Sequence, residues 1–151
     1  MQINMVKDFL KSQDWQFTQI QDKNVIFFGI SGKNGNFQCY ANLRENKKKF
    51  IFFSICGANT PLEKRLSMLE LLNSFNYKLF FGNFEMDLED GEIRFKTSVS
   101  YSNLDLNQHF IKELIMTNIN IMDKSLAAIM KLMFGDISVE EAMKLSDFDE
   151  E

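Results

Sequence analysis

The spacing of hydrophobic residues separates helical from strand-like segments along this 151-residue chain. An amphipathic helix is predicted over residues 3–13, because hydrophobic residues recur there at helical spacing: Ile3, Val6, Phe9 and Leu10. The same criterion predicts a second helix over about 60–77, a long third helix over about 107–134, and a short fourth helix over about 138–145.

Six strands are predicted between these helices from alternating or continuous hydrophobic runs bounded by turn residues. They cover residues 15–20, 25–30, 37–44, 49–56, 84–88 and 93–99. The order α-ββββ-α-ββ-α-α predicts an α+β fold, in which an antiparallel sheet of about six strands packs with N-terminal, middle and long C-terminal helices. We expect residues 1–146 to form one domain and the acidic residues 147–151 to form a flexible tail.

The pair Asn34-Gly35 predicts a two-residue hairpin loop, because both residues readily adopt positive φ. A loop of that length would place Lys33 opposite Asn36 and Ile30 opposite Cys39.

Asp90-Gly91 is a second signal of the same kind, between two strands with alternating hydrophobic residues. A two-residue loop would align Asp87 with Arg94 and Glu85 with Lys96. Opposite charges would then face each other, each pair contributing about 0.2–1 kcal/mol. We therefore interpret the acidic residues of this hairpin as partners of these cations, in preference to a metal or acid–base site.

The start of the middle helix is predicted from Thr60, Pro61 and Glu63. Thr60 and Glu63 fit a capping box, and Pro61 suits the first helical position because its missing N–H is not needed there. One side of this helix is expected to carry a hydrophobic stripe: Leu62, Leu66, Leu69, Leu72 and Phe75 or Asn76.

The long C-terminal helix is expected to begin with a cap from Asp105 or Asn107. Gly135 is expected to end it in the left-handed conformation. Ser138, followed by Glu141, predicts a capping box for the short last helix.

The stretch KKFIFFSI, residues 48–55, would be hydrophobic on both faces of a strand, and residues 25–28 show the same property. Helices can cover one face of such a sheet. The second face could be covered by the middle helix, by a second copy of the chain, or by another polypeptide, since large hydrophobic patches are rarely left bare.

Composition restricts the classes of partner. The net charge of −4 argues against a nucleic-acid-binding protein, and the run Lys47-Lys48-Lys49 is interpreted as a solvated turn. No stretch is long and apolar enough to span a membrane, and the charged N-terminal residues are unlike a signal peptide. Cys39 and Cys56 are expected to be buried free thiols in a reducing compartment.

From Gly82 to Phe95, and again from Gly135 to Ala142, the sequence resembles the YbjN family, whose members share the fold of type III secretion chaperones. The matching positions are Gly82, Phe84, Asp87, Asp90, Gly91, Glu92, Ile93 and Phe95, followed by Gly135, Ser138, Glu140, Glu141 and Ala142. The resemblance extends over the whole chain in the order of elements. It implies a non-enzymatic sensory-transduction regulator or chaperone-like module without a cofactor, and it supplies no catalytic residues.

These observations predict a cytoplasmic, non-enzymatic homodimer that binds a protein or peptide partner, and neither a metal nor a cofactor is expected. The anchor residues for a partner are predicted to be Phe27, Ile51, Phe52 and Phe53. Two alternatives remain open. One is a sensor of a small apolar ligand held between the sheet and the long helix, and the other is an enzyme whose site assembles from scattered residues such as Arg44, Glu70, Asp105 and His109.

Overall fold

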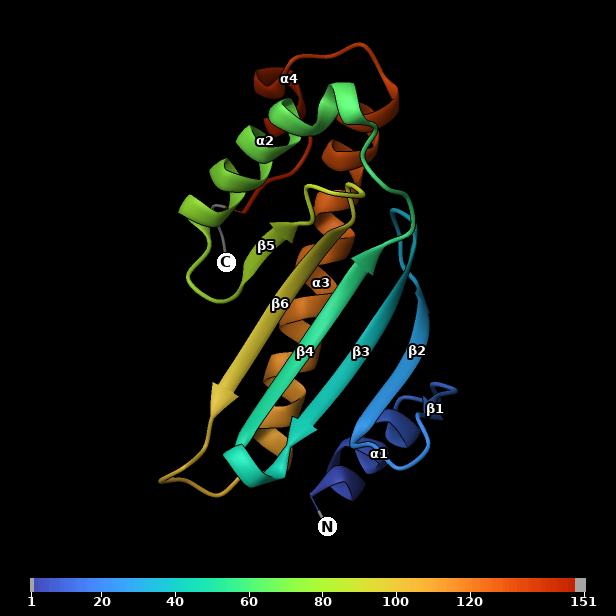
Figure 1. Cartoon of the computed structure of the whole chain (residues 1–151), viewed down its shortest axis with the longest axis vertical. Coiled ribbons are helices and arrows are strands. Elements are labelled where there is room, and N and C mark those ends of the chain that lie inside the picture. Colours follow the sequence, from blue (N-terminus) through green and yellow to red (C-terminus); the bar gives the residue numbers. More distant parts are fainter. Residues whose placement is uncertain (1, 149–151) are drawn as a thin grey trace.

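A computed structural model of the chain describes residues 2–148 and shows a single antiparallel sheet with its long helix on one face (Figure 1). The strands are β1 (Thr18–Gln19), β2 (Val25–Ser31), β3 (Asn36–Arg44), β4 (Lys49–Cys56), β5 (Asn83–Met86) and β6 (Ile93–Ser100). Their order across the sheet is β1-β2-β3-β4-β6-β5. The predicted α+β class and the six antiparallel strands are confirmed.

The helices are α1 (Ile3–Ser12), α2 (Arg65–Lys78), α3 (Gln108–Phe134) and α4 (Val139–Met143), with short 3-10 helices η1 (Glu45–Lys47) and η2 (Leu62–Lys64). The long helix α3 runs along the sheet and packs on β4 and β6, and α1 packs beside it. Helices α2 and α4 pack together at one end of the molecule, where α2 also contacts β5 (Figure 1).

The hydrophobic core lies between the sheet and α3. Because side chains alternate along a strand, every second residue of β2, β3, β4 and β6 points to this inner face. The strands contribute buried residues that include Ile26, Phe28, Phe37, Cys39, Ala41, Phe50, Phe52, Ile93 and Phe95. Helix α3 contributes a wide buried stripe that includes Ile111, Leu114, Ile115, Ile119, Met122, Leu126 and Ile129.

A buried amide, Asn118, joins α3 to the two central strands. Its Nδ2 group donates hydrogen bonds to the carbonyl oxygens of Phe52, at 3.1 Å, and Phe95, at 3.0 Å, and its Oδ1 accepts from the hydroxyl of Ser54. Thr97 completes the group, accepting from Asn118 and donating to the carbonyl oxygen of Leu114 at 2.9 Å. Because each polar atom in this buried group has a partner, the network fixes α3 against β4 and β6 without an unpaired polar group.

The first hairpin has a longer loop than predicted, and its register differs by two residues. Phe28 lies opposite Cys39 and Ile30 opposite Phe37, so four residues form the loop. The carboxylate of Asp123 on α3 accepts hydrogen bonds from the backbone N–H groups of Lys33, at 3.2 Å, and Asn34, at 2.9 Å. This tertiary contact holds the wider loop, which local turn preference does not predict.

The second hairpin also differs by two residues. Glu85 lies opposite Arg94, and the N–H of Asp87 donates to the carbonyl oxygen of Glu92 at 2.9 Å. Gly91 has a φ of 80° and lies against Thr60, where a Cβ atom would come within 2.2 Å of the Thr60 carbonyl oxygen. The loop is therefore shaped by contact with the segment before α2.

The predicted cap of the middle helix is wrong. Helix α2 begins at Arg65 after η2, with no side-chain cap, and Pro61 is extended with a ψ of 149°. Thr60 instead bridges to the second hairpin, donating its N–H to the carbonyl oxygen of Gly91 at 2.8 Å, while its own carbonyl accepts from Arg65.

The first predicted strand is also shorter than expected, because Trp15 packs into the core against Phe28.

The ends of the last two helices match the sequence more closely. Asn107 caps α3 by accepting from the N–H of Phe110, and Ser138 forms the predicted capping box with Glu141. Gly135 does not adopt the predicted left-handed conformation, since its φ is −101°. Glycine still suits this position, because a Cβ atom there would lie only 2.5 Å from the carbonyl oxygen of Lys131. The packed chain continues to Phe148, whose ring lies 4.8 Å from that of Phe75. Residues 149–151 of the expected tail lie outside the described residues.

Replacing Asn118 with Ala should lower the free energy of unfolding by about 1–3 kcal/mol, because the buried hydroxyl of Ser54 would lose its acceptor. Urea-induced unfolding measures this change. Asn120→Ala, at an exposed position on the same helix, is the matched control and should change stability by less than about 0.5 kcal/mol. Equal stability of the two variants would contradict the anchoring role of Asn118.

Candidate functional site

The face of the sheet opposite α3 carries a row of large side chains. Pairing between strands places Phe27, Tyr40, Phe53 and Lys96 side by side across four strands. Parallel rows on either side contain Val25 with Ile51, and Ile55 with Arg94. We define the open sheet face by its six partly exposed hydrophobic residues: Val25, Phe27, Tyr40, Ile51, Phe53 and Ile55.

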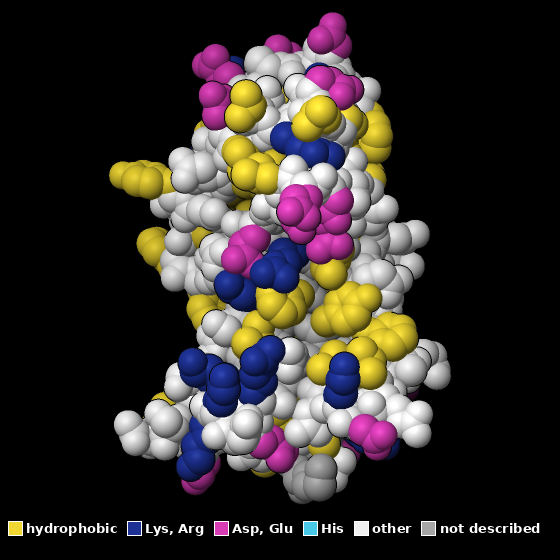
Figure 2. All heavy atoms as spheres, in the orientation of Figure 1, with side chains coloured by type: hydrophobic (Ala, Val, Ile, Leu, Met, Phe, Trp, Pro, Cys, Tyr) yellow, Lys and Arg dark blue, Asp and Glu magenta, His cyan; other side chains and the backbone are white. Residues whose placement is uncertain are grey.

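Within the described chain, no helix lies over these residues, and their burial comes from neighbours on the same face. The rings of Phe27 and Tyr40 stack with centroids 5.9 Å apart, and the Arg94 guanidinium lies 4.5 Å above the ring of Phe53. Figure 2 views this face and shows hydrophobic side chains gathered over the middle strands, with cations and carboxylates around them. A surface of this kind favours binding to another polypeptide.

One carboxylate organises the cations beside the open sheet face. Glu85 on β5 accepts from Arg94 at 2.8 Å and from Lys96 at 3.0 Å, so two cations share one carboxylate. Burial by itself would raise the pKa of Glu85, but the hydrogen bonds and charges of Lys96 and Arg94 outweigh it and lower that pKa. The carboxylate therefore stays ionised at pH values at which an ordinary Glu side chain begins to take up a proton. Within this group of three residues, the two positive charges outnumber the one negative charge.

Three of the four predicted anchor residues lie on the open sheet face: Phe27, Ile51 and Phe53. Phe52 does not, since it points to the inner face and is 0% exposed beneath α3. The alternation of β4 explains this difference, because consecutive residues of a strand face opposite sides. Phe52 is therefore a core residue, and the binding role of the other three remains a prediction.

A second hydrophobic surface lies on α2, where the expected stripe divides between two sides of the helix. The buried side carries Met68, Leu71, Leu72 and Phe75. Leu62, which precedes the helix, and Leu66 face solvent with exposures of 75% and 81%, followed by Leu69 at 36% and Tyr77 at 91%. We call Leu62, Leu66, Leu69 and Tyr77 the α2 stripe. Spacing alone could not tell which of two hydrophobic stripes is buried.

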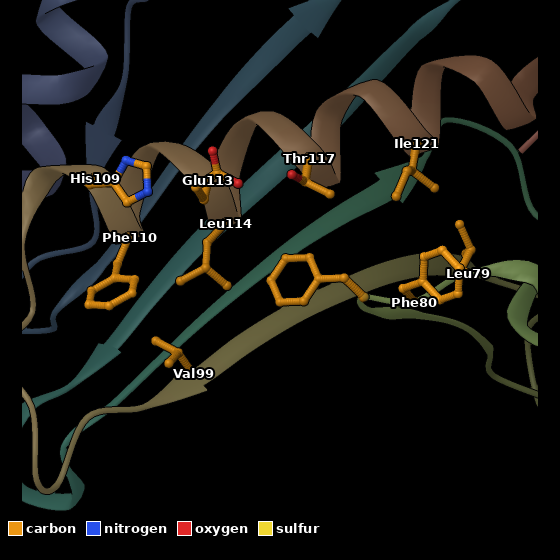
Figure 3. A pocket seen from close by; sticks show the side chains of 10 residues that line it. Leu79, Phe80, Val99, His109, Phe110, Glu113, Leu114, Thr117 and Ile121 are labelled. Atoms are coloured by element: carbon orange, nitrogen blue, oxygen red, sulfur yellow. The ribbon is translucent and has the colours of Figure 1, made fainter. Parts of the chain in front are cut away.

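A pocket of about 550 Å³ opens between α3 and β6 (Figure 3). Its lining is mostly hydrophobic and consists of Leu79, Phe80, Phe81, Val99, Phe110, Leu114 and Ile121, with the polar residues His109, Glu113 and Thr117 on α3. A small apolar ligand between the sheet and the long helix is one of the alternatives that the sequence leaves open, but no residue was predicted to line its site. The segment 79–81 was not assigned to any element.

The scattered polar residues of the enzyme alternative do not form one site. Arg44 lies at the end of β3, Glu70 is on α2 at the opposite end of the molecule, and Asp105 and His109 lie near the start of α3 (Figure 1).

Residues 2–148 contain no group of three His, Cys, Asp or Glu side chains placed to hold a metal ion. No helix in this part of the chain has the length and apolarity required to cross a membrane.

Both cysteines are buried free thiols, as predicted. Burial raises the pKa of Cys39 to about 12, against a smaller lowering effect of its hydrogen bond with Ser54. Burial likewise raises the pKa of Cys56. Thiols that stay protonated in this way are poor nucleophiles.

Comparison with known proteins gives a family match. Residues 2–129 match the model of the YbjN family, described as "Putative bacterial sensory transduction regulator". The comparison with curated proteins found no match.

Solved structures share the fold at low sequence identity. YbjN from E. coli has a TM-score of 0.54 at 10% identity, covering 80% of this chain and 90% of that one. The ExsC–ExsE complex contains a chain with a TM-score of 0.54 at 9% identity, covering 78% and 85%. The HopA1–SchA chaperone–effector complex contains a chain with a TM-score of 0.48 at 15% identity, covering 79% and 88%. The first two similarities show the fold.

The open sheet face should tolerate a charge that the inner face cannot. Phe53→Asp should still fold cooperatively, because the carboxylate can be hydrated and lies beside Arg94 and Lys96. Phe52→Asp should fail to fold, because it buries a charge at a position that is 0% exposed. Thermal denaturation followed by circular dichroism measures both. A Phe53→Asp variant that is as unfolded as Phe52→Asp would show that this face is not open.

Proposed function

Because the chain belongs to the YbjN family, we propose that it is a non-enzymatic module that binds another polypeptide on its open sheet face and associates as a homodimer through the α2 stripe. One observation carries the proposal: six hydrophobic residues on the open sheet face remain partly exposed although the described helices are already packed elsewhere. The ExsC–ExsE structure, which has a similar fold, is a complex between two proteins and supports the same kind of function.

The geometry of the open sheet face suits an extended or helical partner segment. The stacked rings of Phe27 and Tyr40 offer a rigid hydrophobic surface across neighbouring strands. Aromatic side chains with little freedom to lose are typical anchors of protein interfaces. The guanidinium of Arg94 over Phe53 places a charged group on this hydrophobic surface, and the rings of Phe27 and Phe53 stay partly exposed.

The α2 stripe suits association with a second copy. A stripe along one helix meets an identical stripe when two chains are related by a two-fold axis, so the surface complements itself. Leu66, at 81% exposure, lies between Leu62 and Leu69 and would be the centre of such a contact. This assignment leaves the open sheet face free for the partner polypeptide.

The dimer is tested by light scattering after size-exclusion chromatography at high concentration. The wild-type chain should elute as a dimer and Leu66→Glu as a folded monomer, because the charge would be buried in the contact. Leu104→Glu is the matched control, since Leu104 is also exposed, at 61%, but lies outside the α2 stripe. A monomeric wild type, or dissociation of both variants alike, would refute the assignment.

The partner-binding role is tested by affinity purification of the tagged chain from its native cells. A specific partner should be recovered with the wild type and with Leu104→Glu, and its recovery should fall by about tenfold or more with Phe27→Asp. Phe27 is suited to this test because it lies on β2, away from α2 and from the pocket. A set of bound proteins unchanged by Phe27→Asp would show that the open sheet face does not bind the partner.

A further inference from the structure

The pocket of Figure 3 differs from the open sheet face in being concave and in having a polar rim. It lies on the α3 side of the sheet, so it is separate from the surface to which partner binding is assigned above. Its volume of about 550 Å³ falls within the range of roughly 300–1,000 Å³ that is usual for small-molecule sites. The pocket therefore has the size to hold a small molecule, which is a different class of ligand from a polypeptide.

Helix α3 contributes two neighbouring rows of side chains to the pocket. Because residues four apart lie on the same side of a helix, His109, Glu113 and Thr117 form a polar row about 12 Å long. Beside this row, Phe110 and Leu114 project from the helix toward β6 (Figure 3). A ligand in the pocket would therefore contact a hydrophobic floor and a polar rim at the same time.

Further hydrophobic surface comes from the segment that joins α2 to β5. Phe80 and Phe81 line the pocket, yet they are 91% and 39% exposed. Gly82 follows them with a φ of 83°, and a Cβ atom there would lie 2.6 Å from the ring of Phe95. Glycine allows the chain to pass this close to β6, which places Phe81 beside the pocket with part of its surface uncovered. A ligand with a hydrophobic body would cover that surface.

The charged groups at the rim select the sign of the ligand. Glu113 is an exposed carboxylate that forms no ion pair with another residue of the described chain. Within residues 2–148, the lining contains no lysine or arginine, and His109 is the one other lining side chain that can ionise. A carboxylate attracts a cation and repels an anion, and phenyl rings such as that of Phe110 attract cations at their faces. The pocket therefore favours a positively charged ligand.

We propose that this pocket binds a small amphipathic amine, with its ammonium group beside the Glu113 carboxylate and its hydrophobic body between Phe110 and Val99. An ammonium group has three N–H donors, and the hydroxyl of Thr117, one turn further along the rim, offers a second acceptor. This inference goes beyond the proposed protein-binding function and does not depend on it.

The test compares three probes that share one hydrocarbon chain: decylamine, decanol and decanoate. Each is titrated into the isotope-labelled chain below the concentration at which it forms micelles, and binding is followed by the methyl NMR signals of Val99, Leu114 and Ile121. Decylamine should bind about fivefold or more tightly than decanol, because only the amine gains the attraction to the carboxylate and the rings. Decanoate should bind most weakly. The shifts should be largest at these three methyl-bearing residues and small at Val25 and Ile51 on the open sheet face.

Substitutions at the rim separate charge from shape. Glu113→Gln should weaken decylamine by about threefold or more and leave decanol unchanged, because only the amine loses a charge partner. Glu70→Gln, which removes an exposed carboxylate on α2, is the matched control and should change neither. Thr117→Phe should abolish binding of both probes, because the larger side chain fills the pocket. Circular dichroism establishes that each variant is folded.

Equal affinity for decylamine and decanoate, no binding of decylamine, unchanged amine binding in Glu113→Gln, or shifts confined to the open sheet face would overturn the proposal. Phe27→Asp should bind decylamine as the wild type does, so a loss of the protein partner in that variant would leave the amine site intact. If Thr117→Phe does not fold, Glu113→Gln still decides the question, because its position is exposed.

Discussion

The packing of α3 on β4 and β6, anchored by Asn118, determines which face of the sheet is covered. A helix of 27 residues covers one side of the sheet with its buried stripe, and the buried amide holds it there. The buried side chains of α1 and α3 are then used against the inner face, and α2 packs with α4 at one end. Within residues 2–148, the hydrophobic residues on the other face have one another and nearby charged side chains as neighbours, and no helix covers them.

The sequence was sufficient for the elements and for the faces of the strands. Alternation within β4 correctly separates Phe50 and Phe52 from Ile51 and Phe53, because the pleat depends only on local geometry. Both hairpins were nevertheless predicted with a register two residues from the one observed. A shift of two keeps every side chain on its face, which explains why the predicted core survived the error. The contacts responsible, Asp123 with the first loop and Thr60 with the second, join residues distant in sequence.

The surfaces could be predicted only in part. The excess of hydrophobic residues in β2 and β4 identified the open sheet face, whereas Phe52 was included because the prediction did not choose between the two sides of β4. Leu62, Leu66 and Leu69 of the α2 stripe were predicted as a hydrophobic stripe, but their exposure was not, because α2 is hydrophobic on two sides and only packing against α4 and β5 selects the buried one. The pocket depends on how the segment before β5, residues 79–81, lies against α3 and β6, which no local pattern encodes.

The account as a whole requires the rings of Phe27 and Phe53 to be accessible in the free chain. Fluorine NMR of fluorophenylalanine at positions 27, 52 and 53, with a soluble paramagnetic agent at low protein concentration, tests this most directly. The account predicts strong relaxation enhancement of the fluorines at positions 27 and 53 and little at position 52. Equal protection of all three would mean that the chain covers its own sheet on both sides, and that no second polypeptide is needed there.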